Sequence, residues 1–516
     1  MSRKIDPANA ALRTVAGPLT LTLLLCWTAL PAGAQNAWQP APTPTPYTTT
    51  DAPAWFQPAT AAGDGPIRLP GVGDVILEQP AAMDGFVRPT DYVPDANAAA
   101  DMVPDEAQFY TIEELREEMK KLAWVKGDYK IVPYGVLWGS AIYATRRTFP
   151  GFFVLFAQSP TVEGENDLEI DTRRTRLGLD VTGPRIHWFG GADSGGKVEI
   201  DFHGQFLTEN QSTIQIRHAW AEVKNEDWKV MAGQNWDLMS PLLPSTVNYS
   251  VGWAGGNIGF RRMQLRLDRY LHVSDTVMFS VQGAAAQDII PDSLNRVYSI
   301  STGVPGTDYE TYDRVIKPES AAWPVLQGRL GCTLGPQGPN CYPIVFGFSG
   351  HIGEQGFDFL NRSLDDVPYN VPPADDVRIR TWSFNVDARL PLTSNCGFQG
   401  EFFTGADLGT FFGGVAQGVN LDTRRAIRST GGWAEFWYDV SPTLHTHIGY
   451  GIDNPFNEDI TARTGRTHNR FLFTNLMVDV TKKMNLGFEV SYWSTEFLAL
   501  APADSVTFEF SGAYGF

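Results

Sequence analysis

Apolar and polar residues alternate along most of the chain after Tyr129, most clearly in its last stretch, residues 505–516. Every second residue there is apolar, with Gly512 taking one of these positions: Val506, Phe508, Phe510, Tyr514 and Phe516. A period of two places the two sets on opposite faces of a strand. A soluble protein gains nothing from an exposed aromatic edge strand, whereas the last strand of a transmembrane β-barrel pairs with the first and turns its aromatic face to lipid. The alternation by itself also fits a secreted β-sandwich.

The same alternation predicts about sixteen strands, an even number as in single-chain bacterial barrels. Their expected spans are 133–146, 170–182, 196–207, 212–224, 227–234, 257–270, 275–287, 323–333, 343–353, 378–390, 395–405, 430–440, 443–452, 470–481, 484–496 and 505–516. Connections after odd strands are mostly long and those after even strands mostly short, although 183–195 is long for a turn and 208–211 is short for a loop. Short periplasmic turns and long external loops are typical of a barrel. We therefore predict an all-β fold, a transmembrane antiparallel β-barrel over residues 129–516.

On the clearest strands the inward face is polar and charged. In 257–270, for example, Met263, Leu265 and Leu267 should face lipid, with Arg262, Gln264, Arg266 and Asp268 facing inward. A barrel this wide cannot fill its centre with side chains, so its lumen should hold water. In 212–224 the lipid-facing side cannot be told from the inward side, because the apolar Ile214 and Ile216 fall on the same alternate positions as the polar His218 and Glu222.

Three segments precede the predicted barrel. Residues 1–34 have the basic region, apolar run and small-residue site of a signal peptide, with cleavage expected after Ala34. Residues 35–105 are rich in Pro and Ala, which predicts an extended, disordered linker. Residues 106–128 carry apolar side chains every three or four positions, which predicts a periplasmic amphipathic helix. It could be a short coiled coil that joins subunits, which we favour, or a helix packed on one subunit.

Composition narrows the function further. The formal net charge of -18 argues against nucleic acid as a partner, and no segment after the signal is long and apolar enough for a membrane helix. Cys332 and Cys341 could form a disulfide that staples one turn, or all three mature cysteines could be unpaired. The sequence predicts neither a cofactor nor a metal site.

Enzyme motifs are absent from the sequence. His445 and His447 share a strand face, but two histidines without a third ligand are a weak metal signal. No nucleophile elbow, zinc-protease motif or phosphate-binding glycine loop is visible. We therefore do not expect an enzyme, with a hydrolase on the barrel wall as a distant alternative.

Two sets of residues are candidates for the pore. The first consists of arginines on early strands, which would orient carboxylates or phosphates if they point inward: Arg174, Arg176, Arg217, Arg262 and Arg266. They could instead pair with acidic neighbours and only stiffen the wall. The second set lies in the apolar loop 235–256, which should fold inward and narrow the pore, or else form a lid or a subunit contact: Trp236, Asp237, Tyr249 and Trp253.

Several runs in residues 172–270 resemble the DcaP-type porins of bacterial outer membranes. They are RRTRLGLDVTGP, GGKVEIDFHGQF, QIRHAWAEV, WKVMAGQNWDLMSP and IGFRRMQLRL. The resemblance implies a homotrimer of barrels in the outer membrane, each with a periplasmic helical segment and each passing small anionic solutes such as dicarboxylates. It also implies that the five arginines line the pore. The chain departs from the family in its long Pro-rich segment and longer middle loops.

Together these features predict a porin for passive diffusion of small hydrophilic solutes, with a preference for anions and with outer-membrane lipid around it. The rival interpretation is an outer-membrane adhesin or structural barrel whose lumen is plugged. An inner loop that closes the lumen would favour the rival, and a remaining gap lined by arginine would favour the porin.

Overall fold

The structure is a computed structural model that describes residues 123–187, 191–204, 212–289, 297–300, 309–312, 315–336, 342–360 and 374–516. The predicted signal peptide, its cleavage site and the linker lie outside these residues. No helix in the described ranges is long and apolar enough to cross a membrane.

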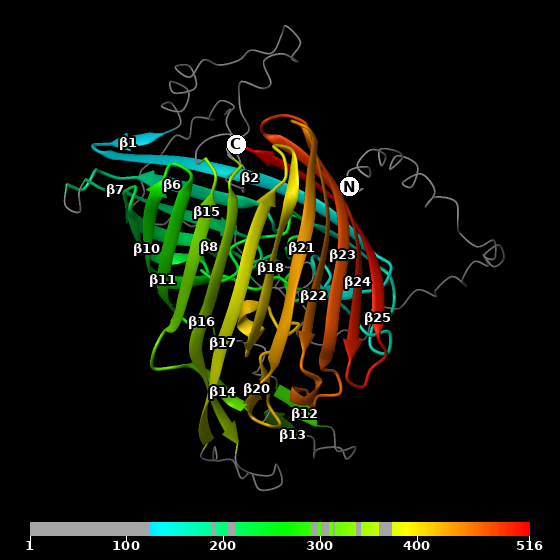
Figure 1. Cartoon of the computed structure of the whole chain (residues 1–516). Helices are drawn as coiled ribbons and strands as arrows, with labels where there is room; N and C mark the ends of the chain where they lie inside the picture. The colour runs from blue at the N-terminus through cyan, green and yellow to red at the C-terminus, as the bar shows by residue number, and fades with distance from the viewer. Residues whose placement is uncertain are drawn as a thin grey trace, which may run out of the picture. The chain divides into compact units, whose positions relative to one another are not determined.

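Antiparallel strands form a closed barrel of 16 strands when β5 and β6 are counted as one interrupted strand. In chain order the wall consists of β2 (Tyr129–Ala144), β5 (Asp167–Asp171) with β6 (Arg176–Thr182), β7 (Asp193–Asp201), β8 (Gln215–Lys224), β9 (Trp228–Trp236), β10 (Arg261–Ser274), β11 (Val277–Ala286), β15 (Val325–Leu334), β16 (Ile344–Leu360), β17 (Ala374–Pro391), β18 (Cys396–Ala406), β21 (Arg428–Ser441), β22 (Leu444–Pro455), β23 (Arg466–Asp479), β24 (Met484–Phe497) and β25 (Ala503–Gly515). The last strand pairs with the first, with Gly139 opposite Gly512, and Figure 1 shows β2 beside β25 at this seam. The predicted barrel and its closure are confirmed.

The remaining elements are short and lie outside the regular wall. They are β1 (Trp124–Lys126), β3 (Thr148–Pro150), β4 (Val154–Ala157), β12 (Val297–Ile300), β13 (Tyr309–Tyr312), β14 (Val315–Ser320), β19 (Val419–Asn420), β20 (Arg425–Ala426), and the 3-10 helices η5 (Gly409–Phe411) and η6 (Asn457–Asp459). The prediction of a helix over 106–128 is wrong at its C-terminal end, because residues 124–126 pair as β1 with the start of β2. Residues 106–122 lie outside the described part of the chain.

Side-chain exposure follows the predicted alternation. On β10, Met263, Leu265 and Leu267 are exposed, whereas Gln264 and Asp268 are buried. A band of exposed apolar side chains on alternate positions is what a lipid-facing wall requires. The charged set faces the interior, as the pattern predicts.

A bulge explains the unclear phase of residues 212–224. Glu199 of β7 lies opposite His218 of β8, and the next residue, Ile200, lies opposite Ile216. Arg217 is therefore an extra residue without a cross-strand partner, and the parity of the apolar face changes there. Ile216 is exposed and Arg217 is buried, so the bulge directs the arginine inward.

A second irregularity separates β5 from β6. Strand β2 pairs with β5 as far as Ser140 opposite Asp171, and with β6 from Val136 opposite Arg176. The intervening residues 172–175 leave the sheet and make a turn closed by the Thr175 amide, which donates to the Thr172 carbonyl at 2.9 Å. Part of β2 is thus left without a neighbouring strand on that side.

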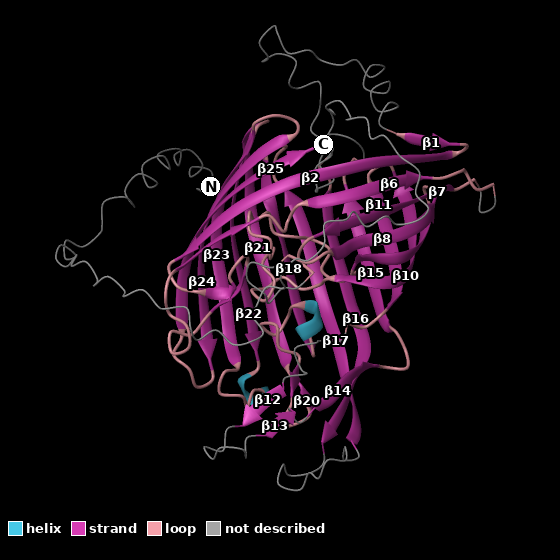
Figure 2. Cartoon of the chain, turned by 180° about the vertical axis from the view of Figure 1, so that it is seen from behind, coloured by secondary structure: helices cyan, strands magenta, loops and turns pink. Residues whose placement is uncertain are grey.

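Three connections place apolar side chains inside the barrel, and we call them the first (145–166), second (237–260) and third (407–427) inner loops. Their buried residues form clusters with each other and with inward side chains of the wall. Figure 2 shows loop segments and a helical turn within the ring of strands. The hydrophobic core of this protein therefore sits in the barrel interior.

Candidate functional site: the inner wall and the inner loops

The second inner loop follows the inner wall from β15 to β25. Its polar groups bond to inward side chains of successive strands: the Leu238 amide donates to Gln327 at 2.8 Å, the Leu242 amide to Glu401 at 2.7 Å, the Ser245 amide to Glu435 at 2.7 Å, the Val247 amide to Glu489 at 2.6 Å, and the Asn248 side chain to Glu509 at 2.9 Å. All four of these glutamates are buried, Glu435 to 2% exposure. Backbone amides, together with the side-chain amide of Asn248, thus bond to the glutamates on this side of the wall.

Local sequence explains why this loop offers free amides. Pro241 and Pro244 cannot donate hydrogen bonds and fix their own backbone angles, so the segment forms neither a helix nor a ladder. Ser240, Val251 and Ala254 adopt left-handed backbone angles, with φ of 48°, 44° and 59°. Residues other than glycine hold such angles only when their surroundings enforce them.

Aromatic packing holds the other end of the second inner loop. Trp253 is 1% exposed, and its ring stacks on Phe412 of the third inner loop with centroids 4.6 Å apart. Tyr249 packs against Phe153 of the first inner loop at 5.4 Å, and Trp236 lies 6.2 Å from Trp253.

The third inner loop also bonds to the second. The Ala254 amide donates to the Phe412 carbonyl at 2.9 Å, and the Gly259 amide to the Phe411 carbonyl at 2.8 Å. Of the three inner loops, only the second was predicted from the sequence. The first and third inner loops contain similarly apolar runs, GFFVLFA (151–157) and TFFGGV (410–415), which could have identified them.

Arg217 is held in a buried network on the opposite side. Its Nε donates to Glu199 at 2.7 Å and its Nη1 to Asp201 at 2.6 Å. The Tyr249 hydroxyl accepts from Arg217 at 3.3 Å and donates to Asp201 at 3.1 Å. The interpretation that an arginine of this set pairs with acidic neighbours holds for Arg217.

Arg262 connects the second and third inner loops. Its Nε donates to Asp237 at 3.2 Å, its Nη2 donates to the Thr410 carbonyl at 2.7 Å, and its guanidinium lies 3.7 Å from the centre of the Phe411 ring. Arg262 is 1% exposed. Arg266 lies further along β10 and donates to Asp268 at 2.8 Å. Both arginines are thus engaged with acidic side chains.

Arg174 and Arg176 differ from the other three arginines. Arg174 donates to the Val247 carbonyl at 2.5 Å and lies over the Trp138 ring at 3.9 Å. Among the described residues neither Arg174 nor Arg176 forms an ion pair with a carboxylate. Arg174 interacts electrostatically with Glu509, Glu489 and Arg217, and Arg176 interacts with Glu199 and Arg217. The structure therefore brings Arg174, Arg176 and Arg217 together, and places Arg262 and Arg266 elsewhere on the wall.

In the part of the chain that the structure describes, metal-ligating groups and thiols add no second site. No group of three or more His, Cys, Asp or Glu side chains in the described ranges could hold a metal ion. His445 instead contacts two carboxylates, Asp439 at 2.6 Å and Asp479 at 3.5 Å. Cys332 is a free thiol in the structure, and Cys341, its suggested partner, lies outside the described residues.

Solved structures with similar folds are outer-membrane proteins. The outer membrane channel DcaP of Acinetobacter baumannii is 17% identical, with a TM-score of 0.54 over 76% of this chain and 99% of that chain. OprB of Pseudomonas putida is 10% identical, with a TM-score of 0.47 over 78% and 97%. An anion-selective porin from Comamonas acidovorans is 11% identical, with a TM-score of 0.43 over 75% and 100%. No protein-family model and no curated protein matches the sequence.

Proposed function

The chain shares the fold of the DcaP channel, and from that premise we propose that it is an outer-membrane porin. Small hydrophilic solutes would cross it by passive diffusion, with a preference for anions such as dicarboxylates. We further propose a homotrimer, on the strength of the sequence resemblance alone. No catalytic step or cofactor is part of this proposal.

The distribution of unpaired charge carries the anion preference. The acidic side of the inner wall is occupied, because Glu401, Glu435, Glu489 and Glu509 accept hydrogen bonds from the second inner loop. The basic side retains Arg174 and Arg176, which form no direct ion pair among the described residues, although Glu509 lies within electrostatic reach of Arg174 and Glu199 within reach of Arg176. Fixed charges that line a pore set its ion selectivity, so the interior should favour anions although the whole chain is acidic.

The experiment is a measurement of reversal potential for the purified protein in a planar bilayer under a salt gradient. The wild-type protein should conduct with a reversal potential that indicates anion preference. A charge interacts with a permeating ion by about 1 kcal/mol at 4 Å in water, so removing both unpaired arginines in Arg174→Gln/Arg176→Gln should lower the anion-to-cation permeability ratio at least about fivefold. Arg185→Gln is the matched control, because Arg185 lies between β6 and β7 and is exposed.

A plugged barrel is the second candidate, and the packing of three inner loops favours it. Trp253 and Phe412 stack in the interior, and Phe153 and Tyr249 pack beside them. If folded and inserted protein carries no current, the porin proposal is wrong and the external loops become the place to look for a binding partner. A wild-type reversal potential that indicates cation preference would retain the porin and refute the anion preference.

A further inference from the structure

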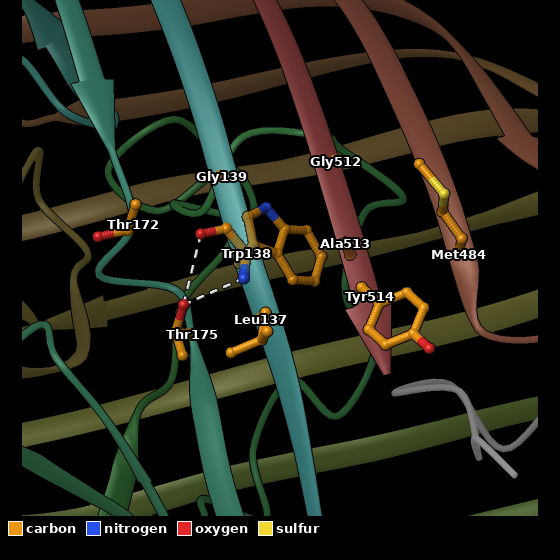
Figure 3. Close-up of a pocket in the computed structure, with 9 residues that line it drawn as sticks. All are labelled: Leu137, Trp138, Gly139, Thr172, Thr175, Met484, Gly512, Ala513 and Tyr514. Atoms are coloured by element: carbon orange, nitrogen blue, oxygen red, sulfur yellow. Dashed lines mark hydrogen bonds between the residues drawn. The ribbon is translucent and has the colours of Figure 1, made fainter. Parts of the chain in front are cut away.

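Arg174 and Arg389 both lie over tryptophan rings, but the two arginines are held differently. The Arg174 guanidinium lies 3.9 Å from the centre of the Trp138 ring and donates to the Val247 carbonyl. The Trp138 amide donates to the Thr175 hydroxyl at 3.0 Å, and that hydroxyl donates to the Trp138 carbonyl at 3.4 Å (Figure 3). Arg174 is thus fixed between β2 and the second inner loop.

The side chain of Arg389 has fewer partners. Its guanidinium lies 5.1 Å from the centre of the Trp437 ring, and in the part of the chain that the structure describes it forms no hydrogen bond and no ion pair. Arg389 belongs to the same alternate positions of β17 as the buried Asn385 and Asp387, so it faces the interior. Unlike them it is partly exposed. The N–H groups of its guanidinium are therefore free to donate to a solute in the lumen.

The carboxylates on neighbouring inward positions already have partners. Asp387, two residues before Arg389 on β17, accepts two hydrogen bonds from Arg329, at 3.1 and 2.6 Å. Glu435 accepts from the side chain of Gln399 at 2.6 Å, and Gln399 lies opposite Arg389 on β18. Because both acidic groups bond elsewhere, the positive charge of Arg389 is available to a solute.

Glycines leave open space beside Arg389. A side chain at Gly397 would collide with the Trp437 ring, and one at Gly347 would collide with the Arg329 guanidinium. The ring and the guanidinium thus lie against the backbones of neighbouring strands, where they do not project into the lumen. A solute can therefore approach Arg389 from the interior.

Arg389 also lies near the short-turn end of the barrel. Strand β17 ends at Pro391, and a short turn leads to β18; in a barrel of this kind the short turns face the periplasm. Gln399, opposite Arg389, donates to the Leu243 carbonyl of the second inner loop at 3.3 Å. Arg389 is therefore level with the edge of that loop nearest to the periplasm, and it meets the loop at a different point from Arg174.

We propose that Arg389 is a second binding position for anionic solutes, at the periplasmic end of the pore, and that it takes carboxylates. This inference rests on the proposed function, because it adds a site to the same permeation path. The fork of a guanidinium matches the two oxygens of a carboxylate, and contact with the Trp437 ring steadies the group while its N–H groups stay free. Two weak sites in series let a solute bind without being trapped.

The test uses the full-length protein in detergent micelles, with phenylglyoxal as the arginine reagent and succinate as the probe. Peptide mass spectrometry measures the rate of modification at each arginine, and sodium chloride of equal ionic strength replaces succinate in the reference reaction. Arg389 should react, and an excess of succinate should slow its reaction at least about fivefold, since at about four times Kd only about one fifth of the sites stay free.

Two other arginines serve as internal controls in the same samples. Arg185 is exposed and lies outside the lumen wall between β6 and β7, so succinate should leave its rate unchanged. Arg329 donates twice to Asp387, so it should react slowly with or without succinate.

Variants in a planar bilayer give a second measurement. Arg389→Gln should weaken the block of chloride current by succinate about tenfold, which is the size expected for a hydrogen bond between charged groups. Arg389→Lys keeps the charge without the fork and should weaken the block at least about threefold. The matched control, Arg329→Gln/Asp387→Asn, removes a paired charge from the same wall and should leave the block unchanged. The shift in gel mobility on heating verifies that each variant folds.

The outcomes separate this site from the proposed function. If Arg389 is not protected in a protein that conducts anions, the site is wrong and the porin stands. If Arg389 is protected in a protein that carries no current, the site is supported and the porin is wrong. Equal succinate block in the wild-type protein and both Arg389 variants also refutes the site.

Discussion

The two sides of the inner wall use their charged side chains differently. From β18 to β25 the wall presents four glutamates, and all four bond to the second inner loop. From β6 to β10 it presents arginines, of which Arg217, Arg262 and Arg266 pair with carboxylates. Among the described residues, Arg176 at the start of β6 and Arg174 in the preceding turn form no ion pair with a carboxylate. The number of charged residues is therefore a poor guide to the charge that a solute would meet in the interior. The acidic side chains hold a loop, and only some of the arginines are left to act on a solute.

The largest effect should come from removing two of the acidic anchors. Glu435→Ala/Glu489→Ala leaves the part-buried amide of Ser245 and the buried amide of Val247 without their acceptors, and each loss costs about 1–3 kcal/mol. The second inner loop should then leave the wall, and chymotrypsin should cleave it near Tyr249 much faster than in the wild-type protein. Glu496→Ala is the control, because Glu496 is exposed on β24. If the two proteins are cleaved at equal rates, the glutamates do not hold the loop.

A single paired arginine should give the next largest effect. Arg217→Met removes the cation that bonds directly to the buried Glu199 and Asp201, and breaking a buried pair in this way costs about 3–5 kcal/mol. The temperature at which heating converts the folded band to the unfolded band on a gel should fall. Adding Glu199→Gln and Asp201→Asn to the same protein should recover most of the loss, since no buried charge then remains unpaired. If the triple variant is as unstable as Arg217→Met, the loss of stability comes from lost packing and not from unpaired charge.

Strand periodicity predicted most of the fold, because a lipid-facing wall imposes a strict alternation on every strand. The faces of the strand over 212–224 could not be assigned from the sequence, because the bulge at Arg217 moves the apolar residues from one set of alternate positions to the other. The end of the predicted helix, residues 124–126, pairs with β2. Helical spacing over a short segment is a weak signal when a strand edge is available nearby.

The candidate site was predicted in part. The sequence identified Arg174, Arg176 and Arg217, which come together, and it left open which of them would be paired. Partners such as Glu401, Glu489 and Glu509 lie far from residues 242–248 in sequence, so only the closed barrel brings them to the loop. The third inner loop needs left-handed angles at Phe412, Val415 and Ala416, which local sequence does not favour and tertiary contacts must enforce.

The smallest expected effect concerns how the second inner loop is held on the basic side. Tyr249 contributes a ring to the aromatic cluster and a hydroxyl to the network of Asp201 and Arg217. Tyr249→Phe keeps the ring and removes a hydrogen-bonding group, so it should destabilise the barrel by only about 1 kcal/mol. Trp253→Ala removes a buried ring and should cost about 3–5 kcal/mol. Both variants are compared by heat-induced unfolding, and Tyr249→Phe is repeated in an Asp201→Asn background to isolate the hydroxyl contact. If Tyr249→Phe proves as costly as Trp253→Ala, hydrogen bonds hold the loop on the basic side as they do on the acidic side, and the two sides of the wall differ in the sign of their charge alone.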